Sequence, residues 1–258
     1  AMAIRPWLMC CNKEGTMAQK KVNAVIHSQE KLAEGIYSMW LDAPEMAEVA
    51  VPGQFIAVYT NDPSKLLPRP ISICEADKEN GRLRIVYRIA GAGTKEFSEC
   101  KAGDTLDIMG PLGNGFPLKK KKAFLIGGGI GIPPMLELAK NLDCEKTAVI
   151  GYRDQETFLA DELRKYADVV IATEDGSVGT KGNVIDAIRA EKLTADIIYA
   201  CGPTPMLKAL KAYAMENGIE CYISLEEKMA CGIGACLGCV CHSKDIDEHS
   251  NVRNKRIC

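Results

Sequence analysis

The feature that most constrains this chain is a group of three cysteines near its C-terminal end. Cys231, Cys236 and Cys239 follow the spacing C-x4-C-x2-C within the run CGIGACLGC. This spacing is typical of the loop that supplies three of the four thiolates of a [2Fe–2S] cluster, while the fourth comes from later in the chain. The interleaved glycines allow the backbone to curl around a cluster and to point N–H groups at its sulfurs. The sequence therefore predicts a carrier of single electrons.

The fourth ligand of such a cluster has to come from outside this loop. Cys258 lies far enough along the chain for a returning strand to present it, and we predict that it completes the set. Cys241 stays open as an alternative, although it lies only two residues beyond Cys239 and would strain the loop. Structural zinc usually needs two C-x2-C pairs and only one is present, so the spacing favours a cluster. His242 and His249 flank the site at a spacing unlike that of Rieske centres.

Composition narrows the class of protein. The chain has 258 residues and a formal net charge of −2, which gives no reason to propose a nucleic-acid partner. No apolar run approaches the roughly 18 residues of a membrane-spanning helix. Six of the twelve cysteines fall between Cys221 and Cys258. Clustered cysteines without a secretory signal indicate metal or redox chemistry rather than disulfides, so we expect a cytoplasmic redox protein that is not bound to a membrane.

The local pattern divides the chain into four segments. Residues 1–16 lack a strand or helix period and are expected to be a leader or a vector-derived extension. Residues 17–118 hold short runs rich in β-branched and aromatic residues, which predict a small antiparallel β-barrel. Residues 119–221 alternate apolar strands with helical stretches, and predict an α/β domain with a parallel sheet. The run LKKKK at 118–122 predicts a solvated linker between them, and residues 222–258 form the cysteine-rich module.

Three short motifs in the barrel segment suit a cofactor that carries phosphate. The first is Arg69-Pro70-Ile71-Ser72, in which a guanidinium and a hydroxyl can bind a phosphate. The second is Val86-Tyr87-Arg88 followed by Gly91-Ala92-Gly93-Thr94, where amides at a helix N-terminus and a hydroxyl would form a phosphate cradle. The third is GPLGNGF at 110–116. Each motif is weak alone, and an exposed arginine in a turn is the ordinary alternative for the first.

The α/β segment carries a second set of candidates at the ends of its strands. GGGIGIP at 127–133 contains Gly128, Gly129 and Gly131 ahead of a helix, but it is not the G-x-G-x-x-G fingerprint. A later strand ends in Glu174 and Asp175. Carboxylates there would bind a ribose 2′-hydroxyl and repel a 2′-phosphate, which predicts NAD rather than NADP.

In this order the motifs resemble the ferredoxin–NADP reductase superfamily. R-P-x-S, Y-R…G-x-G-T and G-P-L-G resemble its flavin domain, while G-G-x-G-I-x-P and C-G-P-x-x-M at 201–206 resemble its nicotinamide-binding turns. The resemblance implies that FAD binds at Arg69–Ser72, Val86–Arg88, Gly93 and Thr94. It also implies that NAD phosphates bind at the glycine turn and that the catalytic residue Cys201 lies near the nicotinamide ring. The ordinary alternative for that cysteine is a small residue at a strand end.

Two longer runs sharpen the resemblance. EEKMACGIGAC at 226–236 and GSVGTKGNV at 176–184 resemble the electron-transfer subunits of class 1B, NAD-dependent dihydroorotate dehydrogenases, a likeness that extends from about Met17 to the end. That family implies FAD and a [2Fe–2S] cluster here, an FMN-containing catalytic subunit as partner, a dimer of heterodimers, and electron flow from dihydroorotate to NAD⁺ in pyrimidine biosynthesis. The interval from Cys239 to Cys258 is longer than is usual in that family. A reductase subunit of a ferredoxin- or hydrogenase-linked complex shares the flavin and nicotinamide motifs and is the alternative.

Overall fold

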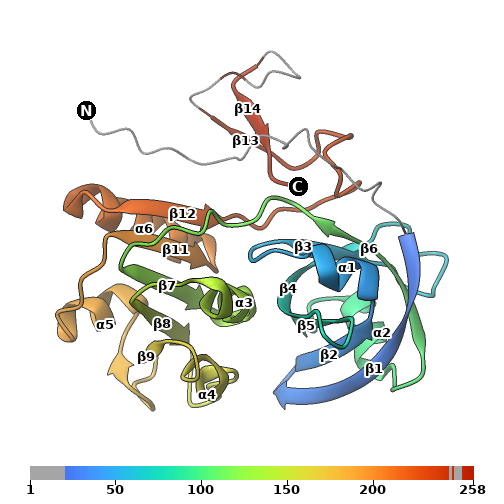
Figure 1. Ribbon diagram of the computed structural model, residues 1–258, viewed down its shortest axis with the longest axis horizontal. Helices are drawn as coiled ribbons and strands as arrows, with labels where there is room; N and C mark the ends of the chain where they lie inside the picture. Colours follow the sequence, from blue (N-terminus) through green and yellow to red (C-terminus); the bar gives the residue numbers. More distant parts are fainter. Residues whose placement is uncertain (1–20, 244–245, 247–251) are drawn as a thin grey trace. The chain divides into compact units, whose positions relative to one another are not determined.

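Backbone contacts divide the chain into two units (Figure 1). The structure is a computed structural model and describes residues 21–243, 246 and 252–258. The barrel unit comprises residues 21–115 together with 226–258, and the sheet unit comprises residues 116–225. The cysteine-rich module thus shares a unit with the barrel. The expected leader at 1–16 and His249 lie outside the described residues. Within the described ranges, no helix is long and apolar enough to cross a membrane.

The predicted antiparallel barrel is confirmed. Six strands close in the order β1-β2-β5-β4-β3-β6, and every pairing is antiparallel. Side chains that alternate along the strands fill the interior; on β6, for example, Leu106 and Ile108 are fully buried. The strands are β1 (Lys21–Ala33), β2 (Ile36–Asp42), β3 (Phe55–Val58), β4 (Arg69–Asp77), β5 (Arg82–Arg88) and β6 (Thr105–Leu112), with helices α1 (Pro44–Val49) and α2 (Ala92–Glu99) between them.

Strand β3 is buried on both of its faces, which explains its uninterrupted apolar sequence FIAV. Ile56 and Val58 belong to the barrel core. Phe55 and Ala57 instead form an outer apolar cluster with Leu112 of β6, and Met229 and Cys258 pack against that cluster. The C-terminal segment therefore covers the outside of the barrel at this strand.

The C-terminal segment folds back on itself as a short hairpin. β13 (Val240–His242) pairs antiparallel with β14 (Asn254–Arg256), and Cys241 lies opposite Lys255. The N–H of Ile257 donates to the carbonyl of Cys239 at 2.9 Å. This register returns the end of the chain to the cysteine loop.

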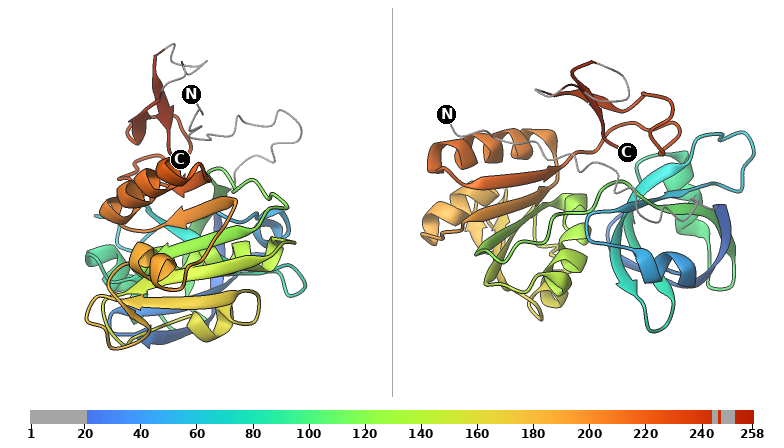
Figure 2. Two further views of the ribbon diagram at one scale, coloured as in Figure 1. Left: turned by 90° about the vertical axis from the view of Figure 1, so that its left-hand side faces the viewer. Right: turned by 45° about the horizontal axis from the view of Figure 1, so that its top comes forward.

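The sheet unit has the predicted parallel sheet with helices on both faces (Figures 1 and 2). Its strands follow the order β10-β9-β8-β7-β11-β12, and α5 and α6 pack against one face. Between β8 and β9 the chain forms α4, a single helical turn, and Leu159 just before it takes a left-handed φ of 64°. The elements are β7 (Ala123–Gly128), α3 (Pro133–Asn141), β8 (Lys146–Tyr152), α4 (Ala160–Leu163), β9 (Asp168–Thr173), β10 (Thr180–Lys181), α5 (Val184–Ala190), β11 (Ile197–Cys201), α6 (Thr204–Asn217) and β12 (Glu220–Ser224).

The strand order places the nucleotide motifs at one point of the sheet. From β7 the chain moves outward to β8 and β9 and then returns to β11 on the other side of β7. Ligands of such sheets bind where the order reverses, at the carboxyl ends of the strands. The turn after Gly128 and the end of β11 at Cys201 meet there.

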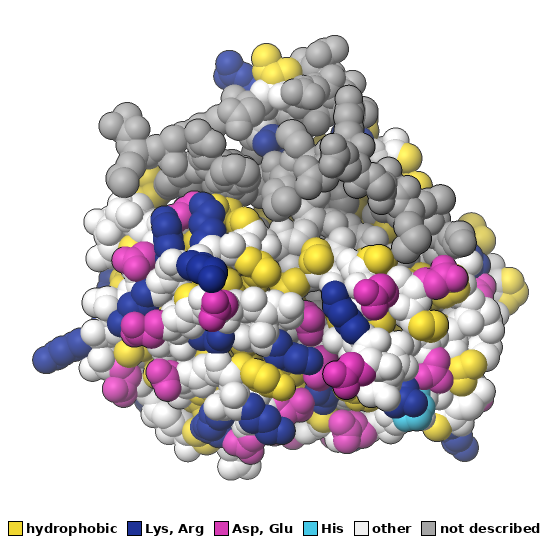
Figure 3. Space-filling view, in the orientation of Figure 1, with side chains coloured by type: hydrophobic (Ala, Val, Ile, Leu, Met, Phe, Trp, Pro, Cys, Tyr) yellow, Lys and Arg dark blue, Asp and Glu magenta, His cyan; other side chains and the backbone are white. Residues whose placement is uncertain are grey.

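The lysine run at 118–122 is largely exposed, as predicted for a solvated linker, and ion pairs also tie it to the sheet. Lys119 donates to Glu220 of β12, and Lys121 donates to the other oxygen of that carboxylate at 3.0 Å. Burial raises the pKa of Glu220, but hydrogen bonds from Lys119, Tyr222 and Lys121 outweigh it and lower this pKa to about 2. On the face drawn in Figure 3, basic and acidic side chains of the described residues intermingle.

Candidate functional site

The structure brings Cys258 into contact with the predicted cysteine loop. Its Sγ lies 3.0 Å from Sγ of Cys239, and the N–H of Gly234 donates to it at 3.1 Å. Burial, followed by the adjoining thiol of Cys239, raises the pKa of Cys258 to about 12. Cys241 sits on β13, where burial raises its pKa. Among the described residues, Cys258 and not Cys241 forms the hydrogen bond to Cys239.

Cys231 and Cys236 form a second pair in the same loop. The N–H of Cys236 donates to Sγ of Cys231 at 3.4 Å, and the Cys236 side chain also hydrogen-bonds it. Burial raises the pKa of Cys231, but backbone N–H groups of Ile233, Cys236 and Ala235 outweigh that effect and lower it to about 6. A thiolate is the form that binds metal, so the backbone N–H groups around Cys231 stabilise the charge that a ligand needs at this position.

Two pairs of thiols suit a cluster with two irons better than a single ion. A [2Fe–2S] cluster takes four cysteine ligands, two on each iron. The donor set and its arrangement fit the predicted cluster.

An arginine that the sequence analysis did not single out holds the loop from the returning strand. Nη1 of Arg256 donates to the carbonyl of Gly234 at 2.9 Å. Gly234 has a φ of 77°, and a Cβ there would lie 3.3 Å from that nitrogen, so glycine fits both the conformation and the contact. Gly234 is therefore hydrogen-bonded on both sides, because Arg256 donates to its C=O and its N–H donates to Cys258. No sequence pattern marks this arginine.

Arg69 and Gly93 meet at the start of α2. A Cβ on Gly93 would lie 2.3 Å from Nε and 2.7 Å from Cζ of Arg69, so a side chain here would push the guanidinium out of its present position. Arg69 also donates to the carbonyl of Leu67. The guanidinium and the first N–H groups of a helix together make a site for phosphate. The two motifs thus converge as a flavin phosphate would require.

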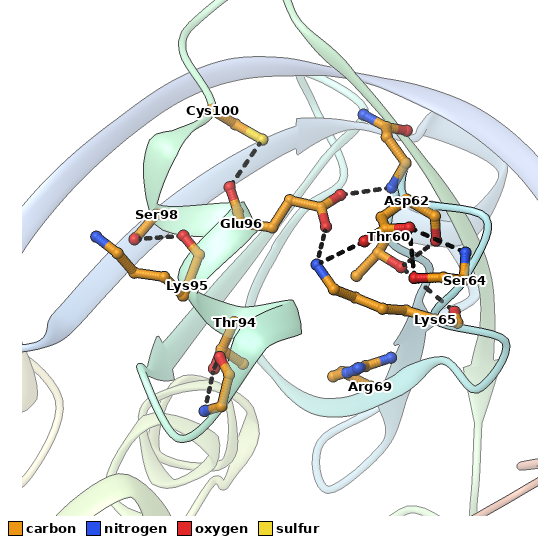
Figure 4. Close-up of polar contacts among 12 residues, drawn as sticks. Thr60, Asp62, Ser64, Lys65, Arg69, Thr94, Lys95, Glu96, Ser98 and Cys100 are labelled. Atoms are coloured by element: carbon orange, nitrogen blue, oxygen red, sulfur yellow. Dashed lines mark hydrogen bonds and ion pairs between the residues drawn. The ribbon is translucent and has the colours of Figure 1, made fainter.

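The hydroxyl of Thr94 folds the turn before α2. It accepts hydrogen bonds from the N–H groups of Ala90 at 2.8 Å and Gly91 at 3.2 Å, and it donates to the carbonyl of Gly91. The neighbouring loop is tied to the same helix, because Lys65 contacts Glu96 at 2.8 Å and Asp62 at 3.3 Å (Figure 4). These ion pairs are support that the sequence motifs do not reveal.

The other predicted flavin residues lie on two neighbouring strands, β4 and β5. Tyr87 belongs to the barrel core: its hydroxyl donates to Gln29 at 2.8 Å and its ring stacks on Tyr37. Burial raises its pKa far above the ordinary value. The buried side chains are Ile71, Val86 and Tyr87, Ser72 is half-buried, and Pro70 and Arg88 are exposed.

Close backbone contact builds the predicted nucleotide turn. A Cβ on Gly131 would lie 2.3 Å from the carbonyl oxygen of Cys201, and one on Gly128 would lie 2.6 Å from Sδ of Met206. Gly129 has a φ of 53° with open space where its Cβ would be, so a ligand can approach its backbone. Cys201 itself is 0% exposed at the end of β11. The turn and the C-G-P motif therefore form one packed corner that fits a nucleotide phosphate.

The two acidic candidates differ in what they already bind. Both follow β9 and are exposed. One oxygen of Asp175 accepts the N–H of Ser177 at 2.9 Å and its hydroxyl at 2.7 Å, bonds that lower the pKa of Asp175. For Glu174 no side-chain partner is found among the described residues. Glu174 is therefore the better placed of the two to accept a ribose hydroxyl.

Comparison with known proteins accounts for both parts of the barrel unit. Residues 226–258 match the family model of the iron–sulfur cluster binding domain of dihydroorotate dehydrogenase B, and residues 23–116 match that of the oxidoreductase FAD-binding domain. The predicted flavin barrel, iron–sulfur module and cofactor classes are thereby confirmed.

Whole-chain relatives and solved structures agree with these matches. The chain is 42% identical over 251 residues to the dihydroorotate dehydrogenase B (NAD(+)), electron transfer subunit of Geobacillus sp. (strain WCH70), covering 94% of this chain and 95% of that one. It is 45% identical over 242 residues to the same subunit of Streptococcus mutans, with 90% and 93% covered. A solved NADH-dependent reduced ferredoxin–NADP oxidoreductase has a TM-score of 0.82 at 30% identity, covering 95% of this chain and 87% of that one. Since the similarity runs nearly from end to end, this chain belongs to the family of electron transfer subunits of dihydroorotate dehydrogenase B.

Proposed function

We propose that this chain carries electrons from an FMN-containing subunit that oxidises dihydroorotate to NAD⁺, as part of pyrimidine biosynthesis. The observation that carries the proposal is the pair of thiol contacts in the C-terminal segment, Cys231 with Cys236 and Cys239 with Cys258. That segment lies in a chain aligned over 94% of its length with a dihydroorotate dehydrogenase B subunit. We assign all four cysteines as cluster ligands.

FAD supplies the exchange between the two electrons of a hydride and the single electrons of an iron–sulfur centre. We assign its phosphate to the Arg69 guanidinium and the first turn of α2, because Gly93 leaves the space between them. Thr94 acts by folding that turn, and Tyr87 acts by filling the barrel core. The two strands that border the site, β4 and β5, carry the remaining predicted residues, Pro70, Ile71, Ser72, Val86 and Arg88.

We assign the NAD phosphates to the turn at Gly128, Gly129 and Gly131. Cys201 is our candidate for the position beside the nicotinamide ring, because it ends β11 against that turn. We assign the ribose hydroxyls to Glu174, with Asp175 shaping the loop through Ser177. A carboxylate in that place repels a 2′-phosphate, which favours NAD over NADP.

We further propose that the chain works in a dimer of heterodimers with its FMN-containing partner in the cytoplasm. Clustered cysteines that serve as metal ligands suit a reducing compartment. The alternative is a reductase subunit of a ferredoxin-linked complex, which the ferredoxin–NADP oxidoreductase of TM-score 0.82 supports. Sequence identity is higher to the dihydroorotate dehydrogenase B subunits, at 42% and 45% against 30%, and favours the first function.

The division of labour between the subunits provides the main test. The isolated chain, loaded with its cofactors, should reduce artificial dyes with NADH but should not turn over dihydroorotate, because none of its motifs supplies a base for a carbon acid. Adding an FMN-containing catalytic subunit should create dihydroorotate-dependent formation of NADH. The absorbance of NADH measures this activity. Dihydroorotate oxidation by the chain alone would contradict the proposal, and failure to couple with any such subunit would favour the ferredoxin-linked alternative.

The flavin site can be tested with two substitutions at the site and one control on the same helix. Gly93→Ala should displace the Arg69 guanidinium and weaken FAD binding. Arg69→Ala should remove a charge-assisted contact worth roughly 1.5–3 kcal/mol, which is about 10- to 150-fold in Kd. Ser98→Ala is the matched control, since Ser98 lies on the same helix and its hydroxyl donates to the carbonyl of Lys95, away from Arg69. Titration of the flavin-depleted protein with FAD measures all three; equal affinity in Gly93→Ala and Ser98→Ala would remove the assigned site.

The ligand set can be tested by single cysteine changes. Replacing Cys231, Cys236, Cys239 or Cys258 with Ala should abolish the cluster while FAD stays bound. Cys241→Ala should keep both irons, because the Cys239 thiol contacts Cys258. Iron analysis and the visible absorbance of the cluster report the result. Loss of iron from Cys241→Ala with retention in Cys258→Ala would reverse the assignment of the fourth ligand.

Nucleotide preference separates the two acidic residues. The parent should oxidise NADH more efficiently than NADPH. Glu174→Gln should reduce that preference, since it removes the charge that repels a 2′-phosphate. Asp175→Asn should change it less, because an amide oxygen can still accept the Ser177 hydrogen bonds. Comparison of kcat/KM for the two nucleotides decides; a parent that uses NADPH equally well would refute the role of both carboxylates.

A further inference from the structure

The ring of Phe55 lies where three sequence motifs meet. As the first residue of β3, Phe55 pairs with Ser72, the last residue of the Arg69–Ser72 motif, and with Leu112 of the G-P-L-G motif. Its side chain is 9% exposed. It belongs to the outer apolar cluster against which Met229 and Cys258 pack, and not to the barrel core.

Two glycines with left-handed backbones border opposite edges of this ring. Gly113, with a φ of 75°, would place a Cβ 2.8 Å from Cε1 and 3.0 Å from Cδ1 of Phe55. Gly232 of the cysteine loop has a φ of 70°, and its Cβ position lies 4.0 Å from Cε2 and 3.4 Å from Cδ1 of Leu112. The ring therefore fills the space that Gly113 leaves, and its other edge lies at van der Waals distance from the Cβ position of Gly232.

We propose that Phe55 is a positioning residue that seats the cluster-binding loop on the flavin-binding barrel and shields one side of the cluster from water. This inference rests on the proposed [2Fe–2S] role of the loop. The backbone of Phe55 belongs to the sheet that carries Arg69, while its ring supports the loop next to Cys231 and, with its apolar cluster, the Cys258 thiol. One residue thus fixes the cluster loop to the strand next to the flavin motif.

The physical consequence concerns the stability and the potential of the cluster. Hydrophobic surroundings limit the access of water to a metal site and tune its reduction potential. Reduction adds a negative charge, and water stabilises that charge. Removing the ring should therefore raise the reduction potential and speed the loss of iron, while the flavin contacts at Gly93 stay in place.

The test uses the full chain loaded with FAD and cluster, as Phe55→Leu and Phe55→Ala. Both should release iron to a chelator faster than the parent, Phe55→Leu by about tenfold, the size typical of changes behind a metal ligand. The reduction potential of the cluster should rise as well. A redox titration followed by electron paramagnetic resonance measures it, and a tenfold change in the one-electron equilibrium would appear as a shift of about 59 mV. FAD content should match the parent. Ile108→Val is the control, because Ile108 lies in the barrel core on β6 and its change should lower stability without altering the potential.

Each outcome is decisive. If Phe55→Leu folds with FAD bound but keeps the parent's iron release and potential, Phe55 does not position the cluster. The same conclusion follows if Ile108→Val shifts the potential as much, since the effect would then come from general loosening. If Phe55→Ala fails to fold, Phe55→Leu decides. A parent that contains no [2Fe–2S] cluster would overturn the proposed function itself, and the inference with it.

Discussion

The barrel unit depends on the burial of β3 from both sides. A barrel strand with one face in water would carry polar residues at alternate positions, whereas β3 is apolar throughout. Its outer face would be an exposed apolar patch unless something covered it. Met229 and Cys258 provide that cover. The one-electron site and the flavin motif are therefore parts of one folded unit, although a whole α/β domain separates them in sequence.

The sheet unit depends on a different constraint, the close approach of two backbones. The carbonyl of Cys201 lies where any side chain on Gly131 would be, and Gly202 approaches Gly128 in the same way. Glycine at these positions lets the end of β11 close against the turn after β7, at the place where the strand order reverses. This packing supports the proposed nucleotide site at the corner, because a ligand can approach the backbone where side chains are excluded.

Most of the fold follows from local patterns, and so it could be predicted. The period of the strands indicates the barrel, the alternation of strands and helices indicates the parallel sheet, and the spacing of Cys231, Cys236 and Cys239 reflects the size of a cluster. What could not be predicted depends on contacts between distant residues. The lysine run is largely exposed, as its composition suggests, but no local pattern reveals that Lys119 pairs with Glu220, 101 residues further on. Arg256 and Phe55 carry no motif, because their importance comes from Gly234, Gly113 and Gly232 beside them.

The flavin motif shows why the role of single residues is harder to predict than the site. The Arg69 guanidinium lies where a side chain on Gly93 would be, and this contact supports the phosphate site that we propose there. Tyr87 packs in the barrel core and bonds to Gln29, and the Thr94 hydroxyl is hydrogen-bonded within its own turn. Asp175 likewise accepts a hydrogen bond from Ser177, and we therefore assign the ribose hydroxyls to the carboxylate of the neighbouring Glu174. A motif residue can therefore serve to shape the backbone around the ligand and not to contact the ligand itself. The contacts that each side chain already makes indicate which of these two roles it has.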